Sequence, residues 1–101
     1  MNYQIEDSAQ ETVCRLAGRM TFADHEAFRE ILTQVDDRQG RKMVFDLSAL
    51  EFVDSSGLGM FIVARDAAMK MGRAFALRGA RGDVRSLIAI AKFHKMFDIV
   101  D

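Results

Sequence analysis

The sequence has no proline, no tryptophan, one cysteine and two histidines in its 101 residues. A lone Cys14 cannot form an internal disulfide, and its apolar neighbours predict a buried thiol in a reducing compartment. So few cysteines and histidines provide no ligand set for a metal such as zinc. No apolar run approaches the roughly 20 residues that a membrane-spanning helix needs. These absences exclude a disulfide scaffold, a zinc-type site and membrane insertion.

Charge and motif content exclude further classes. The net charge is -1, whereas a nucleic-acid partner needs a clustered basic excess. The first residues lack the basic and apolar segments of a secretory leader, which predicts a cytoplasmic protein. There is no linker composition, repeat or phosphate-binding glycine motif, so we expect no cofactor. The simplest expectation is one compact domain over residues 1–101, present as a monomer or weak dimer.

Half of the residues are apolar and 29% are charged, which is typical of a globular chain. Residues 3–7 and 12–17 predict a hairpin whose second strand ends at Gly18. Thr21 followed by Asp24 predicts a helix start. Apolar residues recur from there at roughly helical spacing, namely Phe22, Phe28, Ile31, Leu32 and Val35.

Strands and helices alternate in the rest of the chain. Further strands are expected at residues 43–47, 74–78 and 97–100, and further helices at about 56–71 and, capped by Asp83, at about 83–91. Alternation of this kind predicts an α/β fold with a largely parallel inner sheet. With the opening hairpin, the sheet is expected to be mixed and four- to five-stranded, with about three to four helices mainly on one face.

The stretch DSSGLG, from Asp54 to Gly59, lies where strand-like sequence gives way to a helix. Asp54 or Ser55 can cap that helix. Gly57 and Gly59 each cost up to roughly 1 kcal/mol of helix stability relative to alanine, but leave the backbone open to another molecule. A helix N-terminus favours an anion, so the turn can accept a phosphate of about -1.5 to -2 charges. That phosphate would lie beside Asp54, and we expect Asp46 and Glu51 nearby.

The helix that follows is apolar nearly all round. Leu58, Phe61 and Ile62 can cover the sheet. A second stripe consists of Met60, Val63, Ala67 and Met71. This stripe is either core between the sheet and a neighbouring helix or an exposed patch for a protein partner.

Catalysis has little support in the sequence. A nucleophilic serine needs a base, and the Gly-x-Ser-x-Gly elbow is absent because Val53 and Asp54 precede Ser55. His25 and His94 are the two candidate bases, and both lie among charged residues typical of a solvated surface. We therefore expect no enzyme activity.

The segment MVFDLSALEFVDSSGLGMFIVARDAA resembles the central segment of STAS-domain proteins, in particular the anti-anti-sigma factors (anti-sigma factor antagonists). The matching features are the apolar strand 44–47, Phe52 in the linker, and Asp54 through Gly59. The likeness extends over essentially the whole chain, with Gly18 ending the second strand. Residues 19–24 depart from the sporulation-type members of that family, in a region that helps form the partner surface.

The resemblance implies a partner switch. An anti-sigma factor that is also a serine kinase, and that binds ATP itself, would phosphorylate Ser55, with Ser56 as second candidate, and thereby release the protein. A PP2C-type phosphatase would reverse the step. The partner contacts implied are Asp54, Gly57, Leu58, Gly59, Met60, Val63, Thr21 and Asp24. STAS domains also serve as non-phosphorylated subunits of lipid-transport ATPases and in switches for secretion or biofilm formation, so these alternatives stay open.

Overall fold

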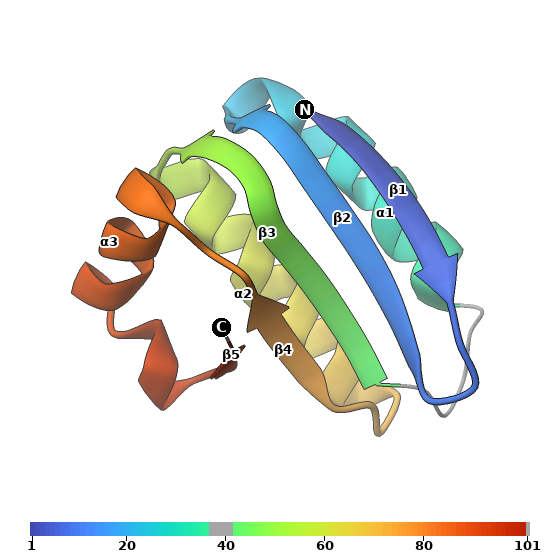
Figure 1. Cartoon of the computed structure of the whole chain (residues 1–101). Helices are drawn as coiled ribbons and strands as arrows, with labels where there is room; N and C mark the ends of the chain where they lie inside the picture. Colours follow the sequence, from blue (N-terminus) through green and yellow to red (C-terminus); the bar gives the residue numbers. More distant parts are fainter. Residues whose placement is uncertain (37–41, 101) are drawn as a thin grey trace.

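The computed structural model describes residues 1–36 and 42–100 of the chain, which form a five-stranded sheet with helices on one face (Figure 1). The strands are β1 (Asn2–Asp7), β2 (Glu11–Met20), β3 (Lys42–Val53), β4 (Phe75–Arg78) and β5 (Asp98–Val100). The helices are η1 (Phe22–Asp24), α1 (His25–Asp36), α2 (Ser55–Lys70), α3 (Gly82–Ile90) and η2 (Phe93–Lys95). The expected mixed α/β class is confirmed.

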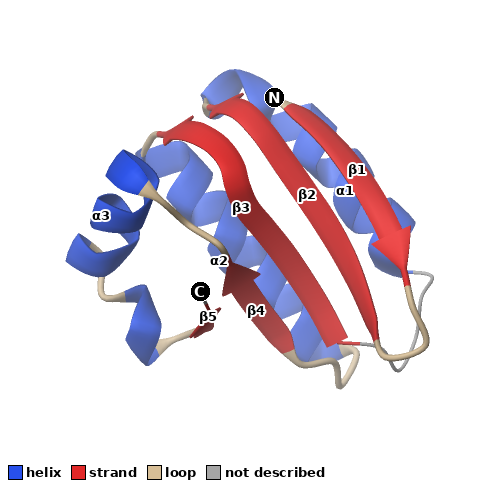
Figure 2. Ribbon diagram, viewed as in Figure 1, coloured by secondary structure: helices blue, strands red, loops and turns tan. Residues whose placement is uncertain are grey.

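The strand order in the sheet is β1-β2-β3-β4-β5. β1 pairs with β2 in the antiparallel sense, and the other neighbours are parallel, because each is joined by a crossover that contains a helix. Helices α1 and α2 lie on one face of the sheet, while α3 lies beside the sheet edge that β4 and β5 form (Figure 2). The strand predicted at residues 97–100 is present as β5 and lies at one edge of the sheet.

The core lies between the sheet and α1 and α2. Met43, Phe45 and Leu47 alternate along β3 and point into it, while Val44 belongs to a small separate cluster on the opposite face. The ring of Phe45 contacts those of Phe28 and Phe61 edge to face, at centroid distances of 5.6 and 6.3 Å. Cys14 is fully buried, as predicted, and burial raises the pKa of its thiol to about 12.

β2 and β3 are both longer than the sequence predicts. β2 does not end at Gly18 but runs to Met20. Gly18 takes a φ of 84° at one of two register shifts between β2 and β3, and the strand continues beyond it. β3 continues through residues 48–53, where a linker was expected, since the shifts let it bend and keep pairing with β2. The two long strands carry the chain to the start of α2.

The start of α3 also differs from expectation. Arg81 occupies the N-cap position without a side-chain cap bond, and Asp83 lies in the first turn, so the prediction that Asp83 caps the helix is wrong. An aspartate in the first turn still favours the helix through its charge. The Arg81 guanidinium instead donates to the carbonyl oxygen of Ser48, at 2.7 and 3.1 Å, and ties α3 to β3.

Candidate functional site

The turn from Asp54 to Gly57, here called the Asp54 turn, joins the end of β3 to the start of α2. Asp54 is the N-cap residue, and its Oδ1 accepts the backbone N–H of Gly57 at 2.9 Å. This settles which of Asp54 and Ser55 caps the helix. Ser55 and Ser56 occupy the first two helical positions; Ser55 is exposed and Ser56 is half-buried. The first turn of α2 therefore presents an accessible hydroxyl at the positive end of the helix dipole.

The second carboxylate oxygen of Asp54 reaches a different element. Its Oδ2 accepts the backbone N–H of Phe22 in η1 at 3.3 Å, and the Asp54 N–H donates to the carbonyl of Met20 at 3.2 Å. Asp54 thus fixes the end of β2 and the start of η1 against the start of α2. One residue thus joins the start of α2 to the β2–η1 connection, more than 30 positions earlier in the sequence.

Phe22 lies beside this turn and is 72% exposed. The apolar spacing placed it on the buried face of the first helix, and that prediction is wrong. Residues 22–24 form a 3-10 turn with three residues per turn rather than 3.6, which takes Phe22 out of line with the buried Phe28 and Ile31. No sequence signal distinguishes these two arrangements.

Thr21 and Asp24 form the predicted capping box, at the start of η1. Thr21 Oγ1 accepts the N–H of Ala23 at 3.3 Å, and Asp24 Oδ2 accepts the N–H of Thr21 at 2.8 Å. The pKa of the Asp24 carboxyl group is lowered, and the hydrogen bond from the Thr21 N–H is the largest cause. Both side chains are half-buried, so they support the shape of the surface around the Asp54 turn.

Gly57 in the Asp54 turn and Gly59 just after it differ in their surroundings. A Cβ on Gly57 would lie 2.3 Å from Val53 Cγ2 and 3.2 Å from the carbonyl oxygen of Met20, so this glycine allows close packing inside the fold. Gly59 is exposed, and a Cβ there would have no atom within 4 Å. The prediction of an open backbone is correct for Gly59 and wrong for Gly57.

The second apolar stripe of α2 is divided between core and surface. Met60 is only 5% exposed and belongs to the core, so the exposed patch does not include it. Val63 and Met71 are exposed, at 56% and 37%, and Ala67 is half-buried. Leu58 is half-buried and packs against the core. Of the stripe, Val63 lies slightly more than two helical turns after Ser55 and is exposed.

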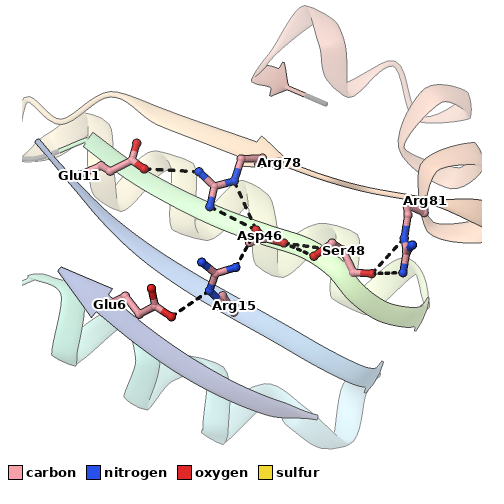
Figure 3. A network of polar contacts seen from close by, with 7 residues as sticks. All are labelled: Glu6, Glu11, Arg15, Asp46, Ser48, Arg78 and Arg81. Atoms are coloured by element: carbon pink, nitrogen blue, oxygen red, sulfur yellow. Dashed lines mark hydrogen bonds and ion pairs between the residues drawn. The ribbon is translucent and has the colours of Figure 1, made fainter. Parts of the chain in front are cut away.

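Asp46 lies on the face of the sheet that no described helix covers (Figure 3). Its Oδ2 is 3.4 Å from Arg15 Nη1 and 3.2 Å from Arg78 Nη2, and its Oδ1 accepts the N–H and hydroxyl of Ser48 at 2.9 and 2.6 Å. Glu6 pairs with Arg15, and Glu11 pairs with Arg78. The carboxylate therefore links β2, β3 and β4.

This environment sets the charge state of Asp46. Burial, the largest single influence, raises its pKa, but the hydrogen bonds from Ser48 and the charge of Arg78 outweigh it, so the pKa lies below the ordinary aspartate value. Asp46 precedes Asp54 by eight residues, or roughly 25 Å of strand at about 3.3 Å per residue. The expectation that Asp46 lies near a phosphate on Ser55 is wrong. Glu51 is exposed, three residues before Asp54.

The two histidines that the sequence offered as candidate bases do not pair with the serines within the described ranges. His25 and His94 are exposed, and among the described residues no hydrogen bond joins either of them to Ser55. In residues 1–36 and 42–100, no three His, Cys, Asp or Glu side chains gather as metal ligands would. The same ranges contain no helix with both the length and the apolar character needed to cross a membrane.

Replacing Asp54 tests its role as the N-cap of α2 directly. We expect Asp54→Ala to lower the free energy of unfolding by about 1–2 kcal/mol, because the cap of α2 is lost. The N–H of Phe22 loses its acceptor in the same variant. Ser55→Ala is the matched control and is expected to stay within about 0.5 kcal/mol of wild type, since its hydroxyl makes no described hydrogen bond. Urea denaturation compares the two; a larger loss in Ser55→Ala would contradict the assignment of the cap.

Comparisons with known proteins identify relatives over the whole chain. The STAS domain family matches residues 1–101. A STAS-domain containing protein of Pseudomonas aeruginosa is 33% identical over 90 residues, which cover 89% of this chain and 88% of the relative. The crystal structure of an anti-sigma factor antagonist from Mycobacterium paratuberculosis has a TM-score of 0.85 at 25% identity, covering 98% of this chain and 84% of that one. The structure of the Bacillus cell fate determinant SpoIIAA in its phosphorylated form has a TM-score of 0.72 at 17% identity, covering 99% and 92%. With a family match over its full length and a relative at this level of identity, the chain belongs to the STAS-domain family.

Proposed function

We propose that this STAS domain is a partner-switching regulator of the anti-sigma factor antagonist type. The unphosphorylated chain binds an anti-sigma factor that is itself a serine kinase, and phosphorylation of Ser55 releases it. A PP2C-type phosphatase restores the binding form. The chain performs no catalysis in this scheme, since the partner holds the ATP.

The observation that carries the proposal is the exposed Ser55 at the first position of α2. Its hydroxyl is not needed as a cap, because Asp54 fills that position. Ser56 is half-buried, which favours Ser55 as the acceptor. A phosphate there would lie at a helix N-terminus, where N–H groups and the dipole stabilise an anion. The fold therefore tolerates both states of the serine, while the surface changes.

The surface around Ser55 suits a protein partner. Phe22 is an exposed apolar side chain beside the turn, Val63 is exposed further along α2, and Gly59 leaves the backbone open. Asp54 directly precedes Ser55, so a phosphate of about -1.5 to -2 charges on Ser55 would add to existing negative charge. Similarity to a SpoIIAA structure in the phosphorylated form supports the proposal, because that protein accepts a phosphate on the same fold.

The first test is a search for the phosphate. The chain is isolated from its native cell with phosphatases inhibited, and intact mass is followed by peptide mapping over residues 50–65. We expect one phosphate on Ser55, lost in Ser55→Ala and kept in the matched Ser56→Ala variant. A phosphate on Ser56 would move the site by one residue. If no growth condition gave a phosphate, the chain would be a constitutive binding subunit, as in the STAS alternatives.

Binding measurements test the switch itself. Against its cognate serine kinase, we expect Ser55→Ala to bind like wild type and to remain bound when ATP is added. Ser55→Asp should weaken binding at least about tenfold, which corresponds to roughly 1.4 kcal/mol. Ser56→Asp is the control for added charge next to the acceptor. Equal affinity of all variants by calorimetry would rule out the switch.

A further inference from the structure

A basic crevice lies at the opposite end of α2 from the Asp54 turn. It has a volume of about 370 Å³ and lies between the last turns of α2, the start of β4 and the segment of η2 and β5. At about 1.5 Å per residue along the helix, Arg65 in its lining is roughly 15 Å from Ser55. The crevice is therefore separate from the surface of the proposed switch.

The charges that line the crevice are mostly of one sign. Arg65, Arg73, His94 and Lys95 face it, with Asp98 as the acidic residue of the lining. The sequence around it is also basic: residues 65–100 contain eight Arg and Lys against three Asp, although the whole chain has a net charge of -1. Like charges gathered in one concavity repel each other, and a bound anion relieves that repulsion.

The two arginines are held in place by the fold. Arg73 is 4% exposed, and its Nη1 donates to the carbonyl oxygen of Val35 in α1 at 2.6 Å, so it contributes charge beneath the crevice rather than an accessible donor. The Arg65 guanidinium lies over the ring of buried Phe97, 5.9 Å from its centroid, and its Nη1 is 3.3 Å from Asp66. An ordered guanidinium loses less entropy on binding than a free one. The arginine side of the crevice is thus preorganised.

The opposite wall is formed by η2. The chain reverses after α3 at Lys92, which has a φ of 58°, in the left-handed region. The N–H groups of Met96 and Phe97 then donate to the carbonyl of Phe93 at 2.9 and 2.8 Å, which fixes the short helix that carries His94 and Lys95. Cationic side chains therefore approach the crevice from α2 and from η2, while the charge of Arg73 is buried beneath it.

We propose that this crevice binds a phosphate group. Donors from α2 and from η2 approach the crevice from two sides, so they can contact different oxygens of a tetrahedral anion. Arginine forks bind phosphate in a bidentate manner, and a lysine adds a point charge. The phosphate can belong to a small soluble compound or to the headgroup of a lipid, since Met69 and Met96 are exposed beside the cations. The site is independent of phosphorylation at Ser55.

The test is an NMR titration of the ¹⁵N-labelled chain with inorganic pyrophosphate at constant ionic strength. We expect saturating shifts confined to amides around Arg65, His94 and Lys95, with a dissociation constant below about 1 mM. Lys95→Glu should weaken binding about tenfold or more, and Lys95→Arg should retain it. Lys70→Glu is the matched control, because Lys70 is exposed on α2 outside the crevice. Ser55→Ala should bind pyrophosphate like wild type.

Chemical-shift changes that do not saturate and spread over all basic residues would overturn the site. Equal losses of affinity in Lys95→Glu and Lys70→Glu would also overturn it.

A second experiment distinguishes the two sources of phosphate, using vesicles of phosphatidylcholine with and without phosphatidic acid. Pyrophosphate binding without vesicle binding assigns a soluble ligand. Binding to the phosphatidic acid vesicles that pyrophosphate displaces, and that Lys95→Glu loses, assigns a lipid headgroup. Binding of neither probe would refute the proposal.

Discussion

Replacing Asp46 by asparagine is expected to lower the free energy of unfolding by about 2 kcal/mol at pH 7, because a nearly buried charge pair is broken. The side chain of Asp46 is 10% exposed, and its oxygens accept hydrogen bonds from Arg15, Ser48 and Arg78. Asparagine keeps the shape but removes the negative charge. The loss is moderate for a buried pair, since Arg15 and Arg78 keep contacts with Glu6 and Glu11.

The matched control for this variant is Asp66→Asn. Asp66 also pairs with an arginine, Arg65, but its side chain is 57% exposed. Exposed pairs of this kind contribute about 0–1 kcal/mol, so Asp66→Asn should leave stability almost unchanged. Urea denaturation at pH 7 compares the two variants. Equal effects would show that the sheet-face network adds nothing beyond a surface ion pair.

The effect of Asp46→Asn should also depend on pH in a defined direction. The pKa of Asp46 is lowered in the folded chain, so its charge stabilises the fold fully above the unfolded value of about 3.9. That stabilisation is lost as the pH falls through the folded pKa. The difference in stability between wild type and Asp46→Asn should therefore hold from pH 7 to about 5 and shrink below about pH 4. A difference that stayed constant to pH 3 would contradict an ionic role for Asp46.

The fold was predictable because its signals are local. The continuous apolar run of β3, the alternation of strands with helices, and Gly72 after α2 each depend on a few adjacent residues. Gly72 takes a φ of 69° directly after the C-cap residue Met71, as a helix end of this kind requires. The lengths of β2 and β3 were not predictable, because they depend on how two strands pair across register shifts.

The surface of α2 could not be read from its sequence. The helix is apolar nearly all round, so no periodicity separates buried from exposed positions. Met60 and Val63 look alike in the sequence, yet one is 5% and the other 56% exposed. The difference comes from where the sheet and α1 lie, which is tertiary information.

The candidate site was predictable only in part, for the same reason. The Asp54 turn is a local pattern and stands where the sequence placed it. The bond from Phe22 to Asp54 joins residues 32 positions apart, and the Asp46 network needs Arg15 and Arg78 in register with Asp46 on two neighbouring strands. The spacing of residues in the sequence predicts neither the bond nor the network. Phe22 beside Ser55 was consequently missed.

Gly57 in the Asp54 turn and Gly59 just after it should respond to alanine in opposite directions. We expect Gly57→Ala to lower the free energy of unfolding by about 2 kcal/mol, the middle of the usual range for overpacking a core. The new Cβ would lie 2.3 Å from Val53 Cγ2, and Val53 is fully buried and cannot move aside easily. The 3.2 Å approach to the Met20 carbonyl adds to the strain. The higher helix propensity of alanine offsets only a part of this loss of stability.

Gly59→Ala should instead raise the free energy of unfolding by about 0.5–1 kcal/mol, because alanine favours the helix and restricts the unfolded chain. No atom lies within 4 Å of its Cβ, so there is no packing penalty. Thermal and urea denaturation of Gly57→Ala, Gly59→Ala and the wild type compare their stabilities. Destabilisation by Gly59→Ala, or tolerance of Gly57→Ala, would contradict the packing around the turn.

The same pair separates stability from partner binding. If a partner approaches the backbone of α2 closely at Gly59, the added methyl group weakens binding in a chain that is more stable than wild type. Such a loss cannot come from unfolding, and it would place the partner directly over the first two turns of α2. Unchanged affinity in Gly59→Ala would show that the glycine is not required for close approach. The partner would then contact the turn through exposed side chains such as Phe22 and Val63, and Phe22→Ala would be the variant that weakens binding.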